Sequence, residues 1–227
     1  INIILSLSQK SNFISIARFI KGGNYIELKY LLDIALKKFP FDKNTANRSL
    51  KYADCEMVVT NYESAEPEYL SVKQCSWNKV VEASSTLPIA IKGYCEIEGK
   101  KYIDGGIADP LPIKYAYDIG YRNIIFIRTN PVNFTEEWNF ETLYASYFLK
   151  DNSRIQALIA NNDKIYSKAQ NFIRKSPKDL NIFQIAPKNT LSCGVLRYSY
   201  DDIISDYRYG LELGLDSLKK INYLLKK

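Results

Sequence analysis

The sequence predicts an α/β fold, arranged as a three-layer α/β/α sandwich with a mostly parallel central sheet. Strand and helix patterns alternate after residue 76, as they do in chains built from crossover units. A predicted helix at 112–120 is followed directly by a strand at 123–128 that contains four consecutive large apolar residues. Such continuous apolar runs are typical of strands that are buried on both faces of a parallel sheet.

The N-terminal part is predicted to be mainly helical. Residues 1–7 are continuously apolar, so a buried strand and a buried helix both fit. A helical pattern over 12–20 ends at two glycines, and Asn24 is expected to cap the next helix. An apolar stripe on that next helix is interpreted as core, with a lipid-binding face as the alternative. The stripe consists of Leu28, Leu31, Leu32, Ala35, Leu36 and Phe39. A short helix is expected within 41–54.

Two hairpins and a helix are predicted in the middle of the chain. Strands at 55–60 and 68–72 flank a turn that contains proline, which indicates a hairpin or a sheet extension. A helix follows at 76–85, with Ser76 as its cap. Alternating residues around Glu98-Gly99-Lys100 predict a small hairpin over 94–103.

Helices dominate the predicted C-terminal part. An aromatic-rich loop and helix are expected at 129–151, and one long helix at 152–175. A last strand is predicted at 181–186. A final amphipathic helix is predicted at 201–225, capped by Asp201 or Asp202.

The absence of histidine restricts the chemistry that these 227 residues can perform. It excludes a Ser-His-Asp or Cys-His arrangement within them, and also histidine-based zinc sites. A hydrolytic base here has to be a carboxylate or a lysine. The four cysteines form no Cys-x-x-Cys pair, so we expect thiols of a reducing compartment and neither a metal site nor a cofactor.

Charge and hydropathy bear on partners. The net charge is +6, with scattered lysines, no arginine-rich arm and no nucleic-acid motif. A basic surface favours anionic lipid by about 1 kcal/mol per residue near the membrane, and a merely solvated surface is the alternative. No apolar run approaches the roughly 18 residues that span a bilayer. We therefore expect a cytoplasmic, membrane-peripheral protein with no transmembrane segment and no nucleic-acid partner.

Asp104 is the strongest candidate for a catalytic residue. It follows the apolar residues Tyr102 and Ile103 and precedes Gly105 and Gly106, so the turn leaves a core strand. Glycine permits positive φ angles and close approach of another backbone or a substrate. The pattern therefore presents a carboxylate to a pocket with little bulk around it, although Asp-Gly is also common in plain surface turns.

The region around Asp104 resembles the patatin-like phospholipases, a family of Ser-Asp acyl hydrolases. The resemblance rests on Ala83-Ser84-Ser85-Thr86-Leu87-Pro88, on the hairpin from Cys95 to Tyr102, and on Asp104-Gly105-Gly106. It implies a patatin-like α/β domain over 1–227, with 152–227 as an alternative helical C-terminal extension. It also implies Asp104 as the catalytic base and Gly105 and Gly106 as residues that shape the site.

The chain departs from this family in one respect. The family's nucleophile is the serine of a Gly-x-Ser-x-Gly elbow, and no such motif occurs in these residues. The resemblance therefore places the nucleophile upstream of residue 1. Ser84 and Ser85 lack a glycine elbow, so we expect them to pack rather than to react. Asp109 is expected to cap the following helix rather than to act directly.

Two functions follow from the resemblance. The first is a serine acyl hydrolase of the lipase or phospholipase A type, which acts on lipid acyl esters through a Ser-Asp dyad. The second is a catalytically inactive relative that binds lipid or protein. A Gly-x-Ser-x-Gly segment ahead of residue 1 distinguishes the first from the second.

Overall fold

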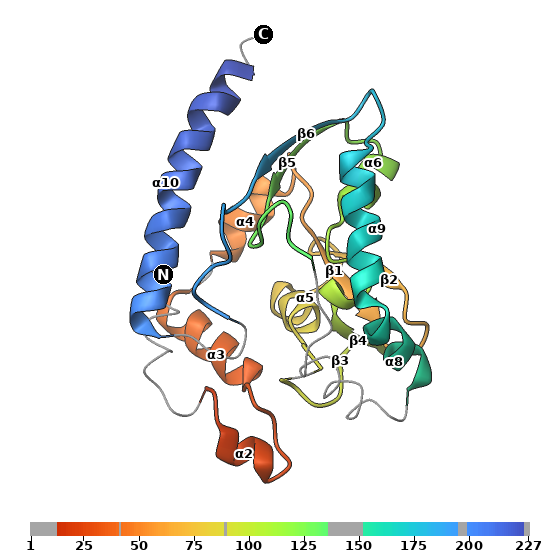
Figure 1. Ribbon diagram of the computed structural model, residues 1–227. Coiled ribbons are helices and arrows are strands. Elements are labelled where there is room, and N and C mark those ends of the chain that lie inside the picture. The colour runs from red at the N-terminus through yellow and green to blue at the C-terminus, as the bar shows by residue number, and fades with distance from the viewer. Residues whose placement is uncertain (1–12, 41, 89, 136–151, 195–198, 225–227) are drawn as a thin grey trace. The chain divides into compact units, whose positions relative to one another are not determined.

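The computed structural model describes residues 13–40, 42–88, 90–135, 152–194 and 199–224, which form a mixed α/β structure (Figure 1). This confirms the predicted α/β class, whereas the segment predicted at 1–7 and the helix predicted within 129–151 lie outside the described residues. The described elements fall into two compact units. In chain order they are α2 (Ile16–Ile20), α3 (Leu28–Lys38), α4 (Lys43–Ser49), β1 (Glu56–Asn61), β2 (Pro67–Ser71), α5 (Trp77–Ser84), β3 (Cys95–Ile97), β4 (Lys100–Asp104), the 3-10 helix η1 (Gly105–Ile107), α6 (Ile113–Asp118), β5 (Asn123–Ile127), α8 (Ser153–Ala160), α9 (Asn162–Arg174), β6 (Asn181–Ile185) and α10 (Tyr200–Leu224).

The first unit, with described residues 13–112 and 152–169, contains a four-stranded sheet in the order β2-β1-β4-β3. Every neighbouring pair in this sheet runs antiparallel, which differs from the mostly parallel sheet that was predicted. The short turns β1–β2 and β3–β4 explain the difference, because parallel strands need a long crossover connection. Glu98 and Gly99, with φ angles of 52° and 80°, form the tight turn that joins β3 to β4. Both predicted hairpins are therefore confirmed.

Helices pack on both faces of this antiparallel sheet. On one face, Ala83 of α5 joins a buried cluster with Val59, Cys95, Ile97 and Tyr102. On the other face, two isoleucines of α8 pack against β4 and η1. That second cluster consists of Ile103, Ile107, Ile155 and Ile159. The end of β4 therefore lies between two apolar layers, and the polar groups there need partners within the protein.

The second unit, with described residues 113–135 and 170–224, contains the parallel pair β5–β6. Its register runs from Asn123 opposite Asn181 to Ile127 opposite Ile185. The predicted strands 123–128 and 181–186 are thus confirmed. Arg122 forms an ion pair with Asp179 at 2.9 Å, next to the start of the pair.

The helix predicted at 152–175 is two helices. α8 ends and α9 begins at Asn161, whose side-chain amide donates to the carbonyl of Ala157 at 2.8 Å. Asparagine side chains compete with the backbone for its hydrogen bonds, which is why asparagine often marks the end of a helix. The carbonyl of Asn161 then accepts from the N–H of Ile165 and opens α9.

Two of the predicted helix caps were wrong, and a third, Ser76, is confirmed in its position. Asn24 accepts from the N–H of Lys92, and Glu27 precedes α3 instead. Ser76 stands at the start of α5 but makes no capping bond with its side chain. Ser199, not Asp201 or Asp202, caps α10: its hydroxyl accepts from the N–H of Asp202, and the Asp202 carboxylate accepts from the N–H of Ser199, a capping box.

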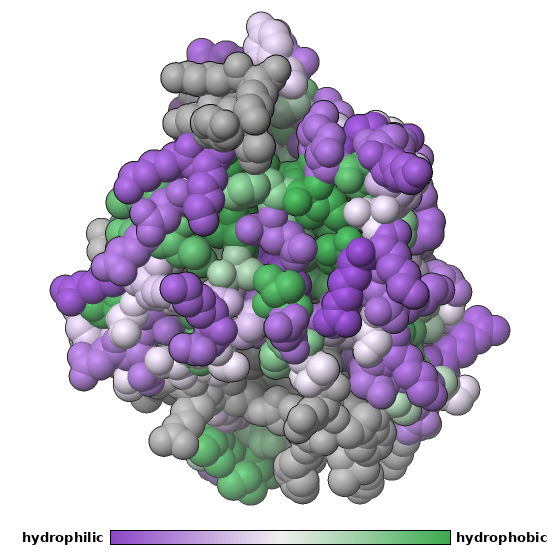
Figure 2. Space-filling model, turned by 45° about the horizontal axis from the view of Figure 1, so that its top comes forward, coloured by the Kyte–Doolittle hydropathy of each residue, from purple (hydrophilic) through white to green (hydrophobic). Residues whose placement is uncertain are grey.

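The apolar stripe of α3 is less buried than predicted. Leu28 is buried, the other members within the helix are half-buried, and Phe39 keeps 40% of its surface exposed. Large apolar side chains are also exposed in β5 and α10, among them Ile125, Ile127 and Leu215. Figure 2 shows hydrophobic areas, in green, between hydrophilic side chains on the face that it displays. None of the described helices is both long enough and apolar enough to cross a membrane.

Candidate active site at Asp104

The backbone of Asp104 is fixed on two sides. Asp104 is the last residue of β4, an interior strand, and lies opposite Val59 of β1. Its N–H donates to the carbonyl of Thr86 at 3.0 Å. Its carbonyl accepts from the hydroxyl of Thr60 at 2.7 Å, and Thr60 is fully buried. The strand end therefore cannot shift toward either neighbour without breaking a buried hydrogen bond.

Gly105 allows the chain to pass directly against β1. A Cβ atom at this position would lie 2.1 Å from the carbonyl oxygen of Val58 and 2.3 Å from its carbonyl carbon. Both atoms belong to the backbone of an interior strand, so they cannot move aside as a flexible side chain would. Gly105 is needed for space, and not for a positive φ angle, which was the other reason to expect glycine there.

The carboxylate of Asp104 has one described hydrogen bond. Its Oδ1 accepts from the N–H of Gly106 at 2.8 Å. Burial raises the pKa of Asp104 above its ordinary value, and the Gly106 N–H partly offsets that rise. Among the described residues no cation forms an ion pair with it. The side chain is half-buried, so the carboxylate is desolvated and yet reachable.

Gly106 leaves room for this carboxylate. A Cβ atom at Gly106 would lie 3.1 Å from Asp104 Oδ1, which is tighter than ordinary contact. Gly106 itself is exposed. Two successive glycines thus serve different neighbours: the first accommodates β1 and the second accommodates the aspartate side chain. The two glycines thus define the space around the Asp104 backbone and carboxylate.

Asp109 closes the same turn. Its N–H donates to the carbonyl of Gly105 at 2.9 Å, and its Oδ2 accepts from the hydroxyl of Tyr69 at 2.6 Å. Burial raises the pKa of Asp109, while the hydrogen bonds from Tyr69 and from the Leu111 N–H oppose that rise. The carboxylate thus binds an N–H two residues further on, before α6 begins at Ile113. It caps the turn that leads into α6, rather than the helix itself as predicted.

The two serines near the site belong to the end of α5. Ser84 ends α5 and Ser85 follows as its C-cap, and within the described part of the chain neither hydroxyl is bonded to Asp104. The segment that follows α5 instead contacts Asp104 through the carbonyl of Thr86, which accepts from the Asp104 N–H. Sequence reasoning missed Thr60, Thr86 and Tyr69. Thr86 stands in the motif that carries the resemblance, and Thr60 follows the apolar run Met57-Val58-Val59, but neither position indicated a bond to Asp104.

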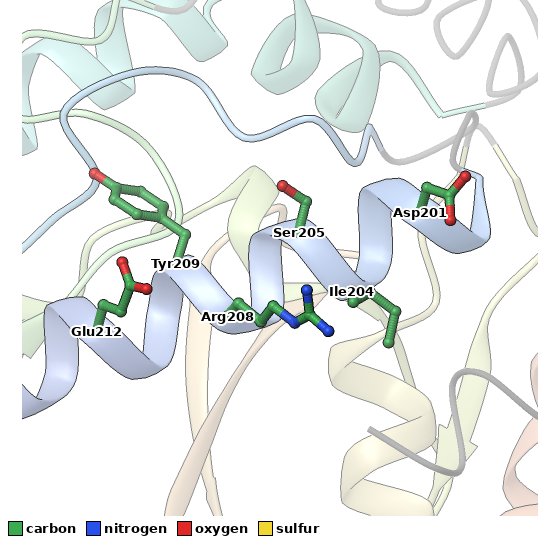
Figure 3. A pocket seen from close by; sticks show the side chains of 6 residues that line it. All are labelled: Asp201, Ile204, Ser205, Arg208, Tyr209 and Glu212. Atoms are coloured by element: carbon green, nitrogen blue, oxygen red, sulfur yellow. The ribbon is translucent and has the colours of Figure 1, made fainter.

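A concave feature lies on α10. It is an open depression of about 450 Å³, and all six of the side chains that line it come from this one helix (Figure 3). Ser205 and Tyr209 project from one side of the helix in this view, and Ile204 and Arg208 lie lower. Lining by a single helix is typical of a surface irregularity, because ligand sites usually draw on several elements. Within the described ranges, no group of three or more His, Cys, Asp or Glu residues could hold a metal ion.

Comparison with known proteins adds two matches. Residues 152–226 match a family model described as "Domain of unknown function (DUF6363)", a range that includes α8, α9, β6 and α10. Over 228 residues the chain is 29% identical to "Uncharacterized protein YjjU" of Escherichia coli (strain K12). That alignment covers 98% of this chain and 63% of the relative, so the chain spans less than two thirds of the relative's length. Neither description names an activity.

Replacing Gly105 should destabilise the fold because its neighbour is backbone. Gly105→Ala is expected to lower the free energy of unfolding by roughly 1–3 kcal/mol or more, since β1 has to move. Gly210→Ala is the matched control, because a Cβ atom there meets nothing within 4 Å in the interior of α10. It should raise stability by about 0.5–1 kcal/mol. Urea unfolding of both variants tests this, and equal effects would contradict the close approach at Gly105.

The raised pKa of Asp104 predicts a pH-dependent change in stability. Because the folded state favours the protonated carboxyl, the contribution of Asp104 is greatest below its unfolded pKa of about 4 and is lost as pH rises through the folded pKa. Asp104→Asn keeps the acceptor for the Gly106 N–H and removes the charge. It should therefore be more stable than the wild type at neutral pH, with an advantage that shrinks on acidification.

Asp42→Asn is the control of opposite sign. Hydrogen bonds from the side chain and the N–H of Thr45 lower the pKa of Asp42. This variant should be less stable than the wild type at neutral pH, and the deficit should shrink on acidification. Thermal unfolding from neutral to acidic pH measures both variants. An Asp104→Asn variant that loses stability at neutral pH would contradict the buried, weakly paired carboxylate.

Proposed function

We propose that the protein is a serine acyl hydrolase of the lipase or phospholipase A type, which hydrolyses lipid acyl esters through a Ser-Asp dyad. Asp104 is its base, and the nucleophilic serine precedes residue 1. The observation that carries the proposal is the desolvated Asp104 carboxylate, held by the Gly106 N–H at the end of an interior strand. The resemblance to patatin-like phospholipases supports the same assignment.

In this reaction the serine oxygen attacks the ester carbonyl while Asp104 takes its proton. The proton then passes to the leaving alcohol, and Asp104 next activates water, which releases the fatty acid from the serine. An ordinary carboxylate is a weak base for an alcohol. A raised pKa brings Asp104 closer to the operating pH and strengthens it as a base.

The proposal extends to the fold. We propose a patatin-like, three-layer α/β/α sandwich with a mostly parallel central sheet. The parallel pair β5–β6 supports it, because a two-stranded parallel sheet is not stable alone and needs further strands and covering helices. The alternating exposure of β5, with Ile125 and Ile127 uncovered, supports the presence of such covering elements in the whole protein.

We further propose a cytoplasmic, membrane-peripheral protein whose substrate is a lipid ester. The net charge of +6 supports an anionic membrane surface as its partner, and the exposed apolar side chains support contact with lipid. A catalytically inactive relative that binds lipid or protein is the second candidate. This second candidate is favoured by three exposed leucines on α10, which offer an apolar surface for binding. They are Leu211, Leu215 and Leu218.

Removing the carboxylate of Asp104 tests the proposed function. In the natural full-length protein, Asp104→Ala should lower the hydrolysis of a fluorogenic lipid ester by about 100-fold or more, the usual contribution of a general base. The variant should keep its fold, because the Asp104 carboxylate contributes little packing and a single described hydrogen bond, from the Gly106 N–H. The control is Asp54→Ala, which removes an exposed carboxylate that pairs with Lys73.

The control should hydrolyse the ester like the wild type. Wild-type turnover in Asp104→Ala would refute Asp104 as the base. A wild-type protein that binds lipid vesicles but hydrolyses no ester would favour the second candidate.

A further inference from the structure

The turn that begins at Asp104 is also fixed at its other end, at Asp109. From Gly105 to Asp109 the chain folds back on itself: the Gly105 carbonyl accepts from the N–H of Ala108 at 3.2 Å and of Asp109 at 2.9 Å. Ile107, in the middle, is buried in the cluster that α8 covers. Movement of Asp109 is therefore transmitted to Gly105 through a closed ring of backbone bonds.

Asp109 is fixed in turn by Tyr69 of β2. The phenolic O–H donates to Oδ2 of Asp109 at 2.6 Å, a short, charge-assisted bond between half-buried groups. Tyr69 lies directly opposite Val58 of β1, and Val58 is the residue whose carbonyl lies against Gly105. The Tyr69–Asp109 hydrogen bond therefore links β2 to the far end of the turn, next to the place where Gly105 lies against Val58 of β1.

We propose that Tyr69 and Asp109 form a clamp that positions Asp104 as the base of the proposed dyad. The inference rests on the proposed function. Neither residue touches the reacting atoms in this account, so both are positioning residues. Loss of the clamp leaves the Asp109 carboxylate with only its local bond from the Leu111 N–H, loosens the ring that ends at Gly105, and weakens the Gly106 N–H bond that orients the Asp104 carboxylate.

The clamp predicts an effect on the pH profile. The Gly106 N–H lowers the pKa of Asp104 against the effect of burial, so a weaker bond raises this pKa further. The acid limb of kcat/KM should then move to higher pH, because Asp104 has to be ionised to accept a proton. Of the acidic groups on the strands and the helix packed here, Glu56 is exposed at the other end of β1, and Glu68 of β2 and Glu82 of α5 form ion pairs with lysines. Cys95 and Glu96 of β3 lie opposite Tyr102 and Lys101 of β4, and Arg154 of α8 donates to the carbonyl of Glu63.

Tyr69→Phe is the test, because it removes only the hydroxyl. In the natural full-length protein it should lower kcat for a fluorogenic lipid ester by about 10- to 100-fold, as small displacements of catalytic groups do. The KM should change little and the acid limb should move to higher pH. Asp109→Asn in the Tyr69→Phe background should add little, since both changes break the same bond.

The chain offers a close control in Tyr102→Phe. Tyr102 donates to the carboxylate of Glu68 at 2.9 Å, so this variant also removes a tyrosine–carboxylate bond from the same sheet, but not from the turn. It should lose stability to a similar degree and keep the wild-type kcat and pH profile. If Tyr69→Phe behaves like Tyr102→Phe while Asp104→Ala is inactive, the clamp is refuted and the proposed function stands.

A titration independent of turnover completes the test. The Asp104 carboxyl, labelled with ¹³C and followed by NMR, should titrate at higher pH in Tyr69→Phe than in the wild type or in Tyr102→Phe. This result would support the clamp geometry even for a protein that hydrolyses no ester, in which case only the proposed function fails. An unchanged Asp104 pKa in Tyr69→Phe overturns the clamp in either case.

Discussion

The close passage of Gly105 against the backbone of Val58 is the constraint on which the candidate site depends. Because the carbonyl of Val58 occupies the space of a side chain at position 105, only glycine fits where the chain turns after β4. The turn places Asp104 at the end of an interior strand and Gly106 beside its carboxylate. The bonds from Thr60 and to Thr86 then hold the backbone of Asp104 on both sides. The close approach at Gly105 and these hydrogen bonds thus define the end of β4 and the orientation of the Asp104 carboxylate.

The burial of the Asp104 carboxylate lowers the stability of the fold and suits the proposed role of this group as a base. A desolvated carboxylate with a single described hydrogen bond destabilises the folded state at neutral pH, and replacement by a neutral residue would relieve that cost. The same desolvation makes the carboxylate a better proton acceptor. Nearby Glu68 shows the contrast: burial raises its pKa, but bonds from Asn61, Tyr102 and Lys100 together outweigh that effect and lower it. The sheet therefore holds two carboxylates whose pKa values shift in opposite directions, because their bonding partners differ.

Local features of the sequence were enough to predict the turn after Asp104, the close approach at Gly105 and both hairpins, because turn chemistry lies within a few neighbouring residues. Other features depend on residues far apart in the chain. Thr60 meets Asp104 across 44 positions, and Tyr69 meets Asp109 across 40, so no local pattern could reveal either bond. The antiparallel pairing of β1 with β4, which joins the two hairpins into one sheet, was missed because partners such as Val59 and Asp104 lie far apart in the chain. The break at Asn161 was missed because apolar periodicity continues across it, while one side-chain bond to Ala157 ends the helix.

In the proposed mechanism, Asp104 serves a serine nucleophile that precedes residue 1. Labelling the natural full-length protein with a fluorophosphonate, which reacts with activated serines, tests it most directly when the labelled peptide is identified by mass spectrometry. The account predicts one labelled serine ahead of residue 1, protected by a competing lipid ester and labelled far more slowly in Asp104→Ala. Absence of label on the folded wild-type protein, or a labelled serine within residues 1–227, would contradict it.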